Sequence, residues 1–323
     1  MRPMIFCNQG GLMIKEEFYF DSRDGENRIH AVRYTPDDGN VRGIVQIVHG
    51  MAEYVERYEN LAEFLTKRGI LVTGEDHLGH GKSVQNEEYH GYFHKTNGNE
   101  YVIGDIHKLR EMTQKKYPDK PYFMLGHSMG SFLIRQYMEM YGSGLSGVIV
   151  MGTGAQPGVA LFFGKLLCKV IAAFKGDDYR SAFVDNMAFG GYNKRFEPAR
   201  TDKDWLTRDE KEVDAYLANP WCTFRFTVNA YYHMFCGIEY AQKKENIEKI
   251  PKDLPLYLVA GSDDPVGNFG KSVENVAKTY RECGIKDVSL KLYEKDRHEI
   301  LNETDRDKVY ADLLAWMRVR IDT

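Results

Sequence analysis

The sequence predicts an α/β fold in which a mostly parallel sheet is flanked by helices and is interrupted once by a helical insertion. Short apolar runs bounded by turn residues alternate along the chain with segments of helical periodicity. This alternation stops near residue 155, and residues 155–241 hold helical patterns without a clear strand. We therefore expect a loosely ordered N-terminal extension at 1–13, a core formed by 14–154 and 242–323, and a helical cap, or lid, formed by 155–241.

The core opens with two apolar runs in 16–34 on either side of the turn RDGE at 23–26, which predicts two strands. Residues 43–50 are apolar apart from Gln46, as a strand buried on both faces should be. Further elements are expected in chain order: a helix at 54–69, a strand at 70–76, a helix at 100–118, a strand at 121–126, a helix that ends near residue 141 and a strand at 147–153.

The alternation of strand and helix returns after the cap. An apolar run at 254–261 and a helical pattern at 268–284 are followed by a strand at 288–294 and a helix at 306–320. Strands that alternate with helices pair in parallel through crossover connections. Helices should therefore cover both faces of one sheet.

The composition excludes several classes of protein. The formal net charge is −4 and no Lys/Arg-rich block occurs, which argues against a nucleic-acid-binding protein. The five cysteines are scattered and form no C-x-x-C pair, so we expect reduced thiols, with neither a zinc site nor a disulfide framework. No apolar run reaches about 18 residues, and the apolar stretch at the N-terminus is too short for a signal peptide. We therefore expect no transmembrane segment and a cytoplasmic location.

A serine stands at the junction of a predicted strand and a predicted helix in the segment YFMLGHSMGSFLIRQYM, residues 122–138. The sequence Gly126-His127-Ser128-Met129-Gly130 fits the pattern G-x-S-x-G in the strand-turn-helix context of a nucleophile elbow. A tight structural turn is the alternative. The context favours Ser128 as a nucleophile, which then needs a base, a carboxylate and oxyanion donors.

The partners of such a serine should follow in the chain as an acid and then a histidine, each just after a later strand. His298 follows the last predicted strand, which predicts it as the base. Asp263 and Asp264 both follow the strand before it. Pro265 restricts the preceding residue to an extended conformation, which favours Asp264 as the acid and Asp263 as a solvated turn residue.

Two backbone N–H groups are expected to stabilise an oxyanion. One belongs to Met129, the residue after the serine. The other belongs to Met51, which follows the end of an early strand at His49-Gly50. We expect His49 itself to pack and to form hydrogen bonds, and not to catalyse.

Three other motif-like stretches do not support a different chemistry. GHGKS at 79–83 lacks the first glycine of a Walker A loop, because Asp76 occupies that position. HEILN at 298–302 lacks the second histidine of a zinc-protease helix, and GTGAQPG at 152–158 has the wrong glycine spacing for dinucleotide binding. We interpret EDHLGHGKS at 75–83 as a turn that supports the site, and we predict no metal site.

The first part of the cap carries an apolar stripe. In the segment 158–176, helical spacing predicts that apolar residues share one side of a helix, namely Leu161, Phe162, Leu166, Val170 and Phe174. The stripe fits a helix packed on the core and equally a lid over an acyl chain, in which Phe162 and Leu166 would bind substrate. Such stripes also meet lipid surfaces. Further residues suit an acyl or aryl pocket or the core: Phe224, Phe226, Tyr231, Tyr232, Met234 and Phe235.

The stretches HGMAEY, DHLGHGKS, GHSMGS, GSDDPVG and RHEILNE, in that order, resemble the motifs of the α/β-hydrolase superfamily. Within it they are similar to the monoacylglycerol lipase and bacterial lysophospholipase-like group. The resemblance covers about 40–155 and 254–323, and 205–227 is similar to the cap of bacterial members. Most of the cap departs from the eukaryotic lipases. The resemblance implies the α/β-hydrolase fold, the triad Ser128, Asp264 and His298, and the oxyanion N–H groups of Met51 and Met129.

We therefore expect a serine hydrolase that cleaves carboxylic esters through an acyl-enzyme, without a metal or an organic cofactor. The expected substrate is a small-molecule or lipid ester, and the cap is expected to make transient contact with a membrane surface. One alternative is an aminopeptidase or amidase that uses the same triad, with Glu239 or Asp185 of the cap holding the amine of the substrate. The other is a non-catalytic binding protein, against which the intact triad argues.

Overall fold

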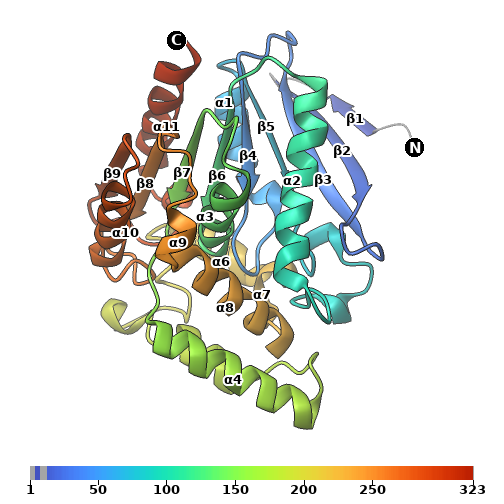
Figure 1. Cartoon of the computed structure of the whole chain (residues 1–323), viewed down its shortest axis with the longest axis vertical. Helices are drawn as coiled ribbons and strands as arrows, with labels where there is room; N and C mark the ends of the chain where they lie inside the picture. Colours follow the sequence, from blue (N-terminus) through green and yellow to red (C-terminus); the bar gives the residue numbers. More distant parts are fainter. Residues whose placement is uncertain (1–3, 8–12, 323) are drawn as a thin grey trace.

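The computed structural model describes residues 4–7 and 13–322, which form one sheet with helices on both faces (Figure 1). Within these residues the sheet has nine strands in the order β1-β2-β3-β5-β4-β6-β7-β8-β9. The pairs β1–β2, β2–β3 and β3–β5 are antiparallel, and the strands from β5 to β9 pair in parallel. The strands are β1 Met4–Cys7, β2 Met13–Asp21, β3 Arg28–Pro36, β4 Gly43–Val48, β5 Ile70–Glu75, β6 Tyr122–His127, β7 Gly147–Met151, β8 Leu256–Gly261 and β9 Val288–Tyr293.

The prediction of a loosely ordered extension is wrong for Met4–Cys7. This apolar run is strand β1, which pairs with β2 so that Met4 lies opposite Glu17. An edge strand offers unpaired backbone groups to such a run, and β1 uses those of β2. Residues 1–3 and 8–12 of the predicted extension lie outside the described residues, and Met13 already begins β2.

The helices predicted for the core are present, two of them with a different start, and the short helix at 244–247 was not predicted. The helix predicted at 54–69 begins with a separate 3-10 turn, and the one predicted at 268–284 begins only at Lys271, because Asn268 and Phe269 have φ values of 49° and 56°. The helices of the core are α1 Glu59–Thr66, α2 Gly98–Lys116, α3 Met129–Tyr141, α9 Lys244–Ile247, α10 Lys271–Glu282 and α11 Arg306–Ile321. Short 3-10 turns are η1 Val55–Tyr58, η2 Gly81–Ser83, η3 Glu87–Tyr89 and η5 Ile300–Asn302.

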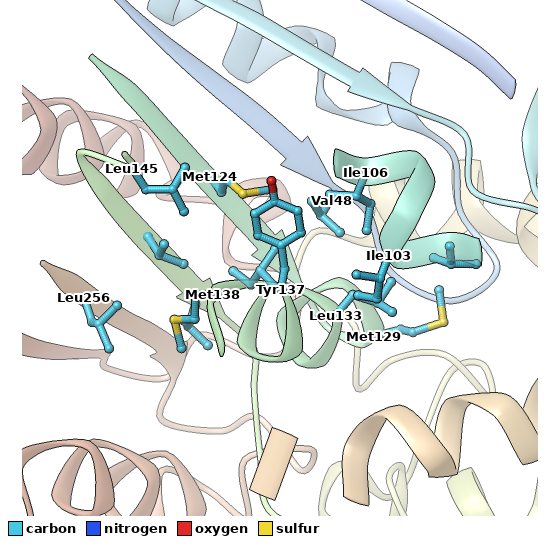
Figure 2. Close-up of a cluster of buried hydrophobic side chains, with 14 of the residues drawn as sticks. Val48, Ile103, Ile106, Met124, Met129, Leu133, Tyr137, Met138, Leu145 and Leu256 are labelled. Carbon is cyan, nitrogen blue, oxygen red and sulfur yellow. The ribbon is translucent and has the colours of Figure 1, made fainter. Parts of the chain in front are cut away.

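Alternating side chains of the sheet enter two separate hydrophobic cores. On β6, Met124 packs with α2 and α3 on one face, whereas Phe123 and Leu125 pack with α1 and α11 on the other. Figure 2 shows Met124 in the first core, close to Tyr137 of α3. A fully buried side chain of this size contributes about 1.5–3 kcal/mol, so both layers of helices are held firmly against the strands that carry the site.

The chain between β7 and β8 forms helices and no strand, all of them described. They gather at one end of the molecule in Figure 1, and we use the word cap for residues 155–241. α8 also packs on the core, since its Ile238 contacts Phe132 of α3 together with Leu161 of α4. The elements are α4 Gly158–Lys175, α5 Ala182–Phe189, η4 Lys194–Phe196, α6 Glu210–Ala218, α7 Pro220–Thr223 and α8 Val228–Gln242. None of the helices in the described residues has the length and apolar character needed to cross a bilayer.

Candidate active site

Ser128 stands at the sharp turn between β6 and α3. Its backbone has φ 54° and ψ −119°, in a positive-φ region that residues other than glycine rarely enter. The turn needs glycine on its far side, because a β-carbon on Gly130 would lie 1.9 Å from the carbonyl oxygen of Val48. Backbone strain of this kind concentrates at functional sites. Here it presents a serine at the start of a helix, which is the geometry of a nucleophile elbow.

His298 and Asp264 meet at the ends of neighbouring strand-loop units. The imidazole Nδ1 of His298 lies 3.0 Å from both carboxylate oxygens of Asp264, and Asp264 is completely buried. The backbone N–H of Val266 donates a hydrogen bond of 2.9 Å to Asp264 Oδ1, which fixes the carboxylate. A carboxylate only accepts, so Nδ1 carries the proton and Nε2 is the basic nitrogen.

Asp263 faces away from His298. Its side chain is 31% exposed, and Arg195 lies 3.8 Å from its carboxylate. Of the two aspartates that the sequence offered, the structure therefore brings Asp264 to the histidine, as the effect of Pro265 suggested.

Aromatic rings hold the imidazole of His298. The ring centroids of His127 and Trp205 lie 4.8 Å and 5.1 Å from its own. The backbone N–H of His298 donates to the carbonyl oxygen of Trp205 at 3.4 Å, and Nε2 of His127 lies 3.3 Å from the carbonyl oxygen of His298. His298 and Ser128 line one common cavity.

The loop after β4 brings Met51 next to Ser128. A β-carbon on Gly50 would lie 3.0 Å from the β-carbon of Ser128, so the backbone passes directly beside the serine. Met51 lines the cavities on both sides of Ser128, and Met129 lines one of them at the first turn of α3, where backbone N–H groups lack helical partners. Both predicted oxyanion donors thus border the serine, and their role stays a prediction.

Glu53 ties this loop to the turn that carries the serine. Its Oε1 accepts a hydrogen bond from the N–H of Gly50 and lies 3.2 Å from Nδ1 of His127. Burial opposes the charge of Glu53, but the hydrogen bond with His127 and the charges of His127 and Arg57 lower its pKa below the usual value. Burial likewise opposes the charge of His127, yet Glu53 raises its pKa. The contact thus favours the charged form of both side chains.

Three buried histidines, His49, His77 and His80, pack together beside the loop that follows β4. The N–H of His77 donates to Nε2 of His49 at 3.1 Å, and the two rings stack with centroids 3.9 Å apart. Burial and the neighbouring histidines lower the pKa of His80 to about 3 and that of His49 well below its usual value, so both rings stay neutral. EDHLGHGKS and His49 thus have the supporting role that the sequence predicted.

Two cavities open from Ser128, and Met51 and Phe189 line both of them. The first is mostly apolar and contains about 610 Å³ between α4, α5, α8 and the loop of Asp264. Its lining includes Phe132, Leu161, Leu167, Val184, Met234 and Phe235. The second is more polar and contains about 310 Å³ beside His298. Its lining includes Asp185, Asp202, Lys203, Tyr216, Thr223 and Arg225.

The family model described as "Serine aminopeptidase, S33" matches residues 39–305. The chain belongs to this family. A monoglyceride lipase of Mus musculus is 27% identical over 299 residues, which cover 90% of this chain and 86% of the mouse protein. A monoacylglycerol lipase of Mycolicibacterium smegmatis is 27% identical over 292 residues, which cover 88% of this chain and 90% of that protein.

Solved structures resemble the whole chain. A highly thermostable carboxyl esterase from Bacillus coagulans, in complex with glycerol, has a TM-score of 0.88 and 32% identity and covers 95% of this chain and 99% of its own. A structure described as a lipase in the open form has a TM-score of 0.86 and 27% identity, with 96% and 100% covered. The α/β-hydrolase fold and the monoacylglycerol lipase-like group predicted from the motifs are thereby confirmed.

The prediction that Phe162 and Leu166 bind substrate is wrong. Their side chains are 57% and 47% exposed, and neither lines a cavity at Ser128. Leu161, Gly164 and Leu167 of the same helix line the apolar cavity instead. The error arose because α4 is apolar on two sides, so the spacing alone did not determine which side faces inward.

The apolar and aromatic residues predicted for a pocket or the core divide among three places, and Tyr232, which lines neither cavity, packs partly buried against the core. Met234 and Phe235 line the apolar cavity, Phe224 lines the polar one, and Phe226 and Tyr231 are fully buried in the core. The lining also contains aromatic residues that the sequence analysis did not single out, namely Phe189, Tyr192, Trp205 and Tyr216. Trp205 and Tyr216 lie within the stretch 205–227 that resembles bacterial caps. This resemblance was the one feature of the sequence that could have indicated them as lining residues.

The two carboxylates considered for binding an amine already have partners. Glu239 forms an ion pair of 2.7 Å with Lys165, and it lines neither cavity. Asp185 lines the polar cavity, but it accepts a hydrogen bond of 2.6 Å from the hydroxyl of Tyr231 and lies 3.5 Å from Arg225.

Three carboxylates close to His298 have the spacing of a metal site. Oxygens of Asp296, Glu303 and Asp305 lie within 4.8 Å of one another. The guanidinium of Arg208 contacts all three, so a cation of the protein already fills this position. The cluster therefore gives no reason to add a metal to the predicted chemistry.

Proposed function

We propose that this chain is a serine ester hydrolase of the monoacylglycerol lipase type, with Ser128 as nucleophile, His298 as general base and Asp264 as the residue that orients the imidazole. The observation that carries the proposal is the contact of His298 Nδ1 with both oxygens of Asp264, at 3.0 Å each, beside a cavity that His298 shares with Ser128. The lipases and the esterase among the relatives support an ester as the bond that is cleaved.

Each step of the reaction uses a group of this site. Nε2 of His298 removes the proton of Ser128 Oγ as that oxygen attacks the ester carbonyl, and the N–H groups of Met51 and Met129 stabilise the resulting oxyanion. The imidazolium then gives its proton to the departing alcohol, which leaves an acyl-enzyme. Water, deprotonated by His298, attacks the acyl-enzyme and releases the acid, and the proton returns to Ser128.

The two cavities suit the two parts of a lipid ester. An acyl chain fits the apolar cavity of about 610 Å³, where each buried methylene contributes about 0.8 kcal/mol. A polar alcohol such as glycerol or a lysophospholipid headgroup fits the cavity that contains Asp202, Lys203 and Arg225. Both cavities meet at Ser128, which is where the ester carbonyl has to lie.

The outer surface of the cap supports transient contact with a membrane. Large apolar side chains of α4 and α5 are between 46% and 86% exposed, namely Val159, Phe162, Phe163, Leu166, Val170, Phe174, Phe183 and Met187. Exposed apolar area of this kind on a surface helix is typical of interfacial binding. On this proposal, Phe162 and Leu166 contact lipid outside the protein and do not bind the acyl chain within it.

An aminopeptidase that uses the same triad is the second candidate, and the description of the family favours it. An aminopeptidase must bind the charged amine of its substrate with a carboxylate. Glu239 is paired with Lys165 and lies outside the cavities, and Asp185 is engaged by Tyr231 and Arg225. Ester hydrolysis therefore fits the site better.

Ser128→Ala tests the nucleophile. We expect the variant to fold but to lose hydrolysis of nitrophenyl esters and monoacylglycerols by about 10⁴-fold to 10⁶-fold, and to lose labelling by a fluorophosphonate. His298→Ala should behave in the same way. Ser143→Ala, an exposed serine just beyond α3, is the matched control and should keep full activity.

Turnover of aminoacyl anilides above that of esters by the wild type would replace ester hydrolysis with the aminopeptidase proposal. Normal ester turnover by Ser128→Ala would remove Ser128 from the mechanism. A wild-type chain that neither hydrolyses esters nor reacts with the fluorophosphonate would favour a binding protein.

A further inference from the structure

Arg208 of the cap contacts three carboxylates on the loop that carries His298, namely Asp296, Glu303 and Asp305, whereas Glu299, the neighbour of the histidine, pairs with Arg57. Its Nε lies 3.0 Å from Glu303, and its Nη2 lies 2.7 Å from Asp305 and also contacts Asp296. The side chains of Asp296 and Glu303 are fully buried. One guanidinium thus joins points on the loop that lie before and after the histidine.

Backbone hydrogen bonds run between the same two segments. The carbonyl oxygen of Trp205 accepts from the N–H of His298 at 3.4 Å, and that of Leu206 accepts from the N–H of Glu299 at 2.7 Å. The carboxylate of Glu303 also accepts from the N–H of Arg208 at 3.2 Å. Residues 205–208 of the cap and the histidine loop are therefore joined by backbone hydrogen bonds as well as by the guanidinium of Arg208.

The loop depends on these contacts for its shape. β9 ends at Tyr293 and α11 begins at Arg306, so the only regular structure between them is the turn η5. The cluster has a second arginine nearby, but the guanidinium of Arg297 points to carbonyl oxygens of Asp204 and Thr207. Arg208 is thus the cation that separates three carboxylates which would otherwise repel one another within 4.8 Å.

We infer that Arg208 is a positioning residue, which holds the loop 296–305 so that Nε2 of His298 faces Ser128. The inference rests on the proposed role of His298 as the base. On this inference, a residue of the cap helps to position the catalytic base. Arg208 does not touch the substrate, but the rate of proton transfer by His298 depends on it. Because Asp296 and Glu303 are fully buried, losing the partly exposed Arg208 would leave two buried carboxylates without their cation, which favours the one arrangement of the loop that keeps the contact.

The test compares Arg208→Ala with Arg200→Ala. Arg200 lies in the same cap and forms an exposed ion pair of 2.6 Å with Asp214, so it matches the lost charge without touching the histidine loop. The substrate is p-nitrophenyl acetate, whose acyl group is too short to reach the far part of the apolar cavity. We expect kcat of Arg208→Ala to fall about 10-fold to 100-fold with KM nearly unchanged, as for a small misplacement of a catalytic group. Arg200→Ala should match the wild type.

Rescue separates positioning from general stability. Guanidinium chloride at low millimolar concentration, with EDTA present to exclude metal ions, should restore part of the kcat of Arg208→Ala by filling the space between the carboxylates. It should not raise the kcat of Arg200→Ala or of the wild type. Arg208→Lys keeps one charge but cannot span three carboxylates, so its kcat should lie between those of the wild type and the alanine variant.

A kcat of Arg208→Ala equal to that of the wild type would overturn the inference, and would leave the proposed function intact if His298→Ala is inactive. A loss of kcat that guanidinium does not restore and that follows the loss of thermal stability would also overturn it. If Arg208→Ala does not fold, the comparison is made on Arg208→Lys, where a wild-type kcat overturns the inference and a reduced kcat with unchanged KM supports it. Activity in His298→Ala would instead contradict the proposed function.

Discussion

Two segments of the cap that precede α6, here called its first and second half, are attached to the rest of the molecule in different ways. The first half, α4 and α5, packs an apolar inner face on α8 and the core and leaves an apolar outer face exposed. The second half, residues 192–208, is joined to the loops of Asp264 and His298 by directional contacts. These include the backbone hydrogen bonds of Trp205 and Leu206, the cluster around Arg208, and Arg195, whose guanidinium lies 4.2 Å from the ring of Phe269.

This difference determines which half is able to move. Apolar contacts are not directional, so α4 can shift on α8 at the cost of one partly exposed ion pair, that of Lys165 with Glu239. In α5, Asp185 is held by a hydrogen bond from the buried Tyr231 of α8. The second half cannot move without breaking hydrogen bonds and ion pairs that are buried. We therefore expect substrates to enter by displacement of α4, while residues 192–208 stay with the histidine loop.

The largest effect should come from the acid beside the fixed half. Asp264→Asn should lower kcat by about 10⁴-fold, because an amide can favour the wrong tautomer of His298, as in the serine-protease precedent. Asp263→Asn is the matched control, since Asp263 is the neighbouring aspartate and contacts only Arg195 of the cap. Steady-state kinetics on nitrophenyl esters measures both. A larger loss for Asp263→Asn would reverse the assignment of the two aspartates.

The inner face of the movable half should control chain length. Gly164 lines the apolar cavity, and a β-carbon there would lie 2.9 Å from the ring of Phe235. Gly164→Leu should therefore fill part of the cavity and lower kcat/KM for long acyl chains by about 10-fold to 100-fold, while acetate esters are spared. A series of nitrophenyl esters of increasing chain length gives the profile. Equal losses at every length would show that the variant disturbs packing and not selection.

The outer face of the same helix should act only when the substrate is in a membrane. Phe162→Ser together with Leu166→Ser should lower hydrolysis of monoacylglycerol in phospholipid vesicles about tenfold, because apolar area that enters the lipid is lost. Hydrolysis of a short ester in free solution should not change. Vesicle co-sedimentation and the two assays measure the effect. An equal loss in both assays would remove the membrane role from this face.

The arrangement of the candidate site was largely predictable because local sequence determines it. Ser128 is identified by a strand, two glycines and a helix within one short segment, and His298 by its place after the last strand. Asp264 was separated from Asp263 by one proline. In each case the physical constraint acts between neighbours in the chain, so the sequence displays it directly.

The cap and the edge of the sheet were less predictable because their constraints are long-range. Helical spacing identified α4, but both of its sides are apolar, and only packing on α8 determines that Leu161 faces inward and Phe162 outward. Strand β1 depends on the free edge of β2. The contacts of Arg208 join residues about 90 positions apart, and nothing near Arg208 in the sequence indicates them.

The last expected effect concerns the dependence of stability on pH and the cluster of the fixed half. Burial raises the pKa of Asp296 to about 7, the charges of Glu303 and Asp305 act in the same direction, and Arg208 opposes them. The pKa in the unfolded chain is about 3.9. Because the folded value is higher, Asp296 contributes stability that is fully present below the unfolded pKa and is lost as the pH rises through about 7.

The variant Asp296→Asn removes this titration. Between the two pKa values, the free energy of unfolding of the wild type relative to the variant should fall by up to about 1.4 kcal/mol per pH unit and then become constant. Urea unfolding of both proteins over this range measures the difference. A constant difference would mean that Arg208 keeps Asp296 fully ionised, in which case the fixed half is held by a complete ion cluster at every pH in that range.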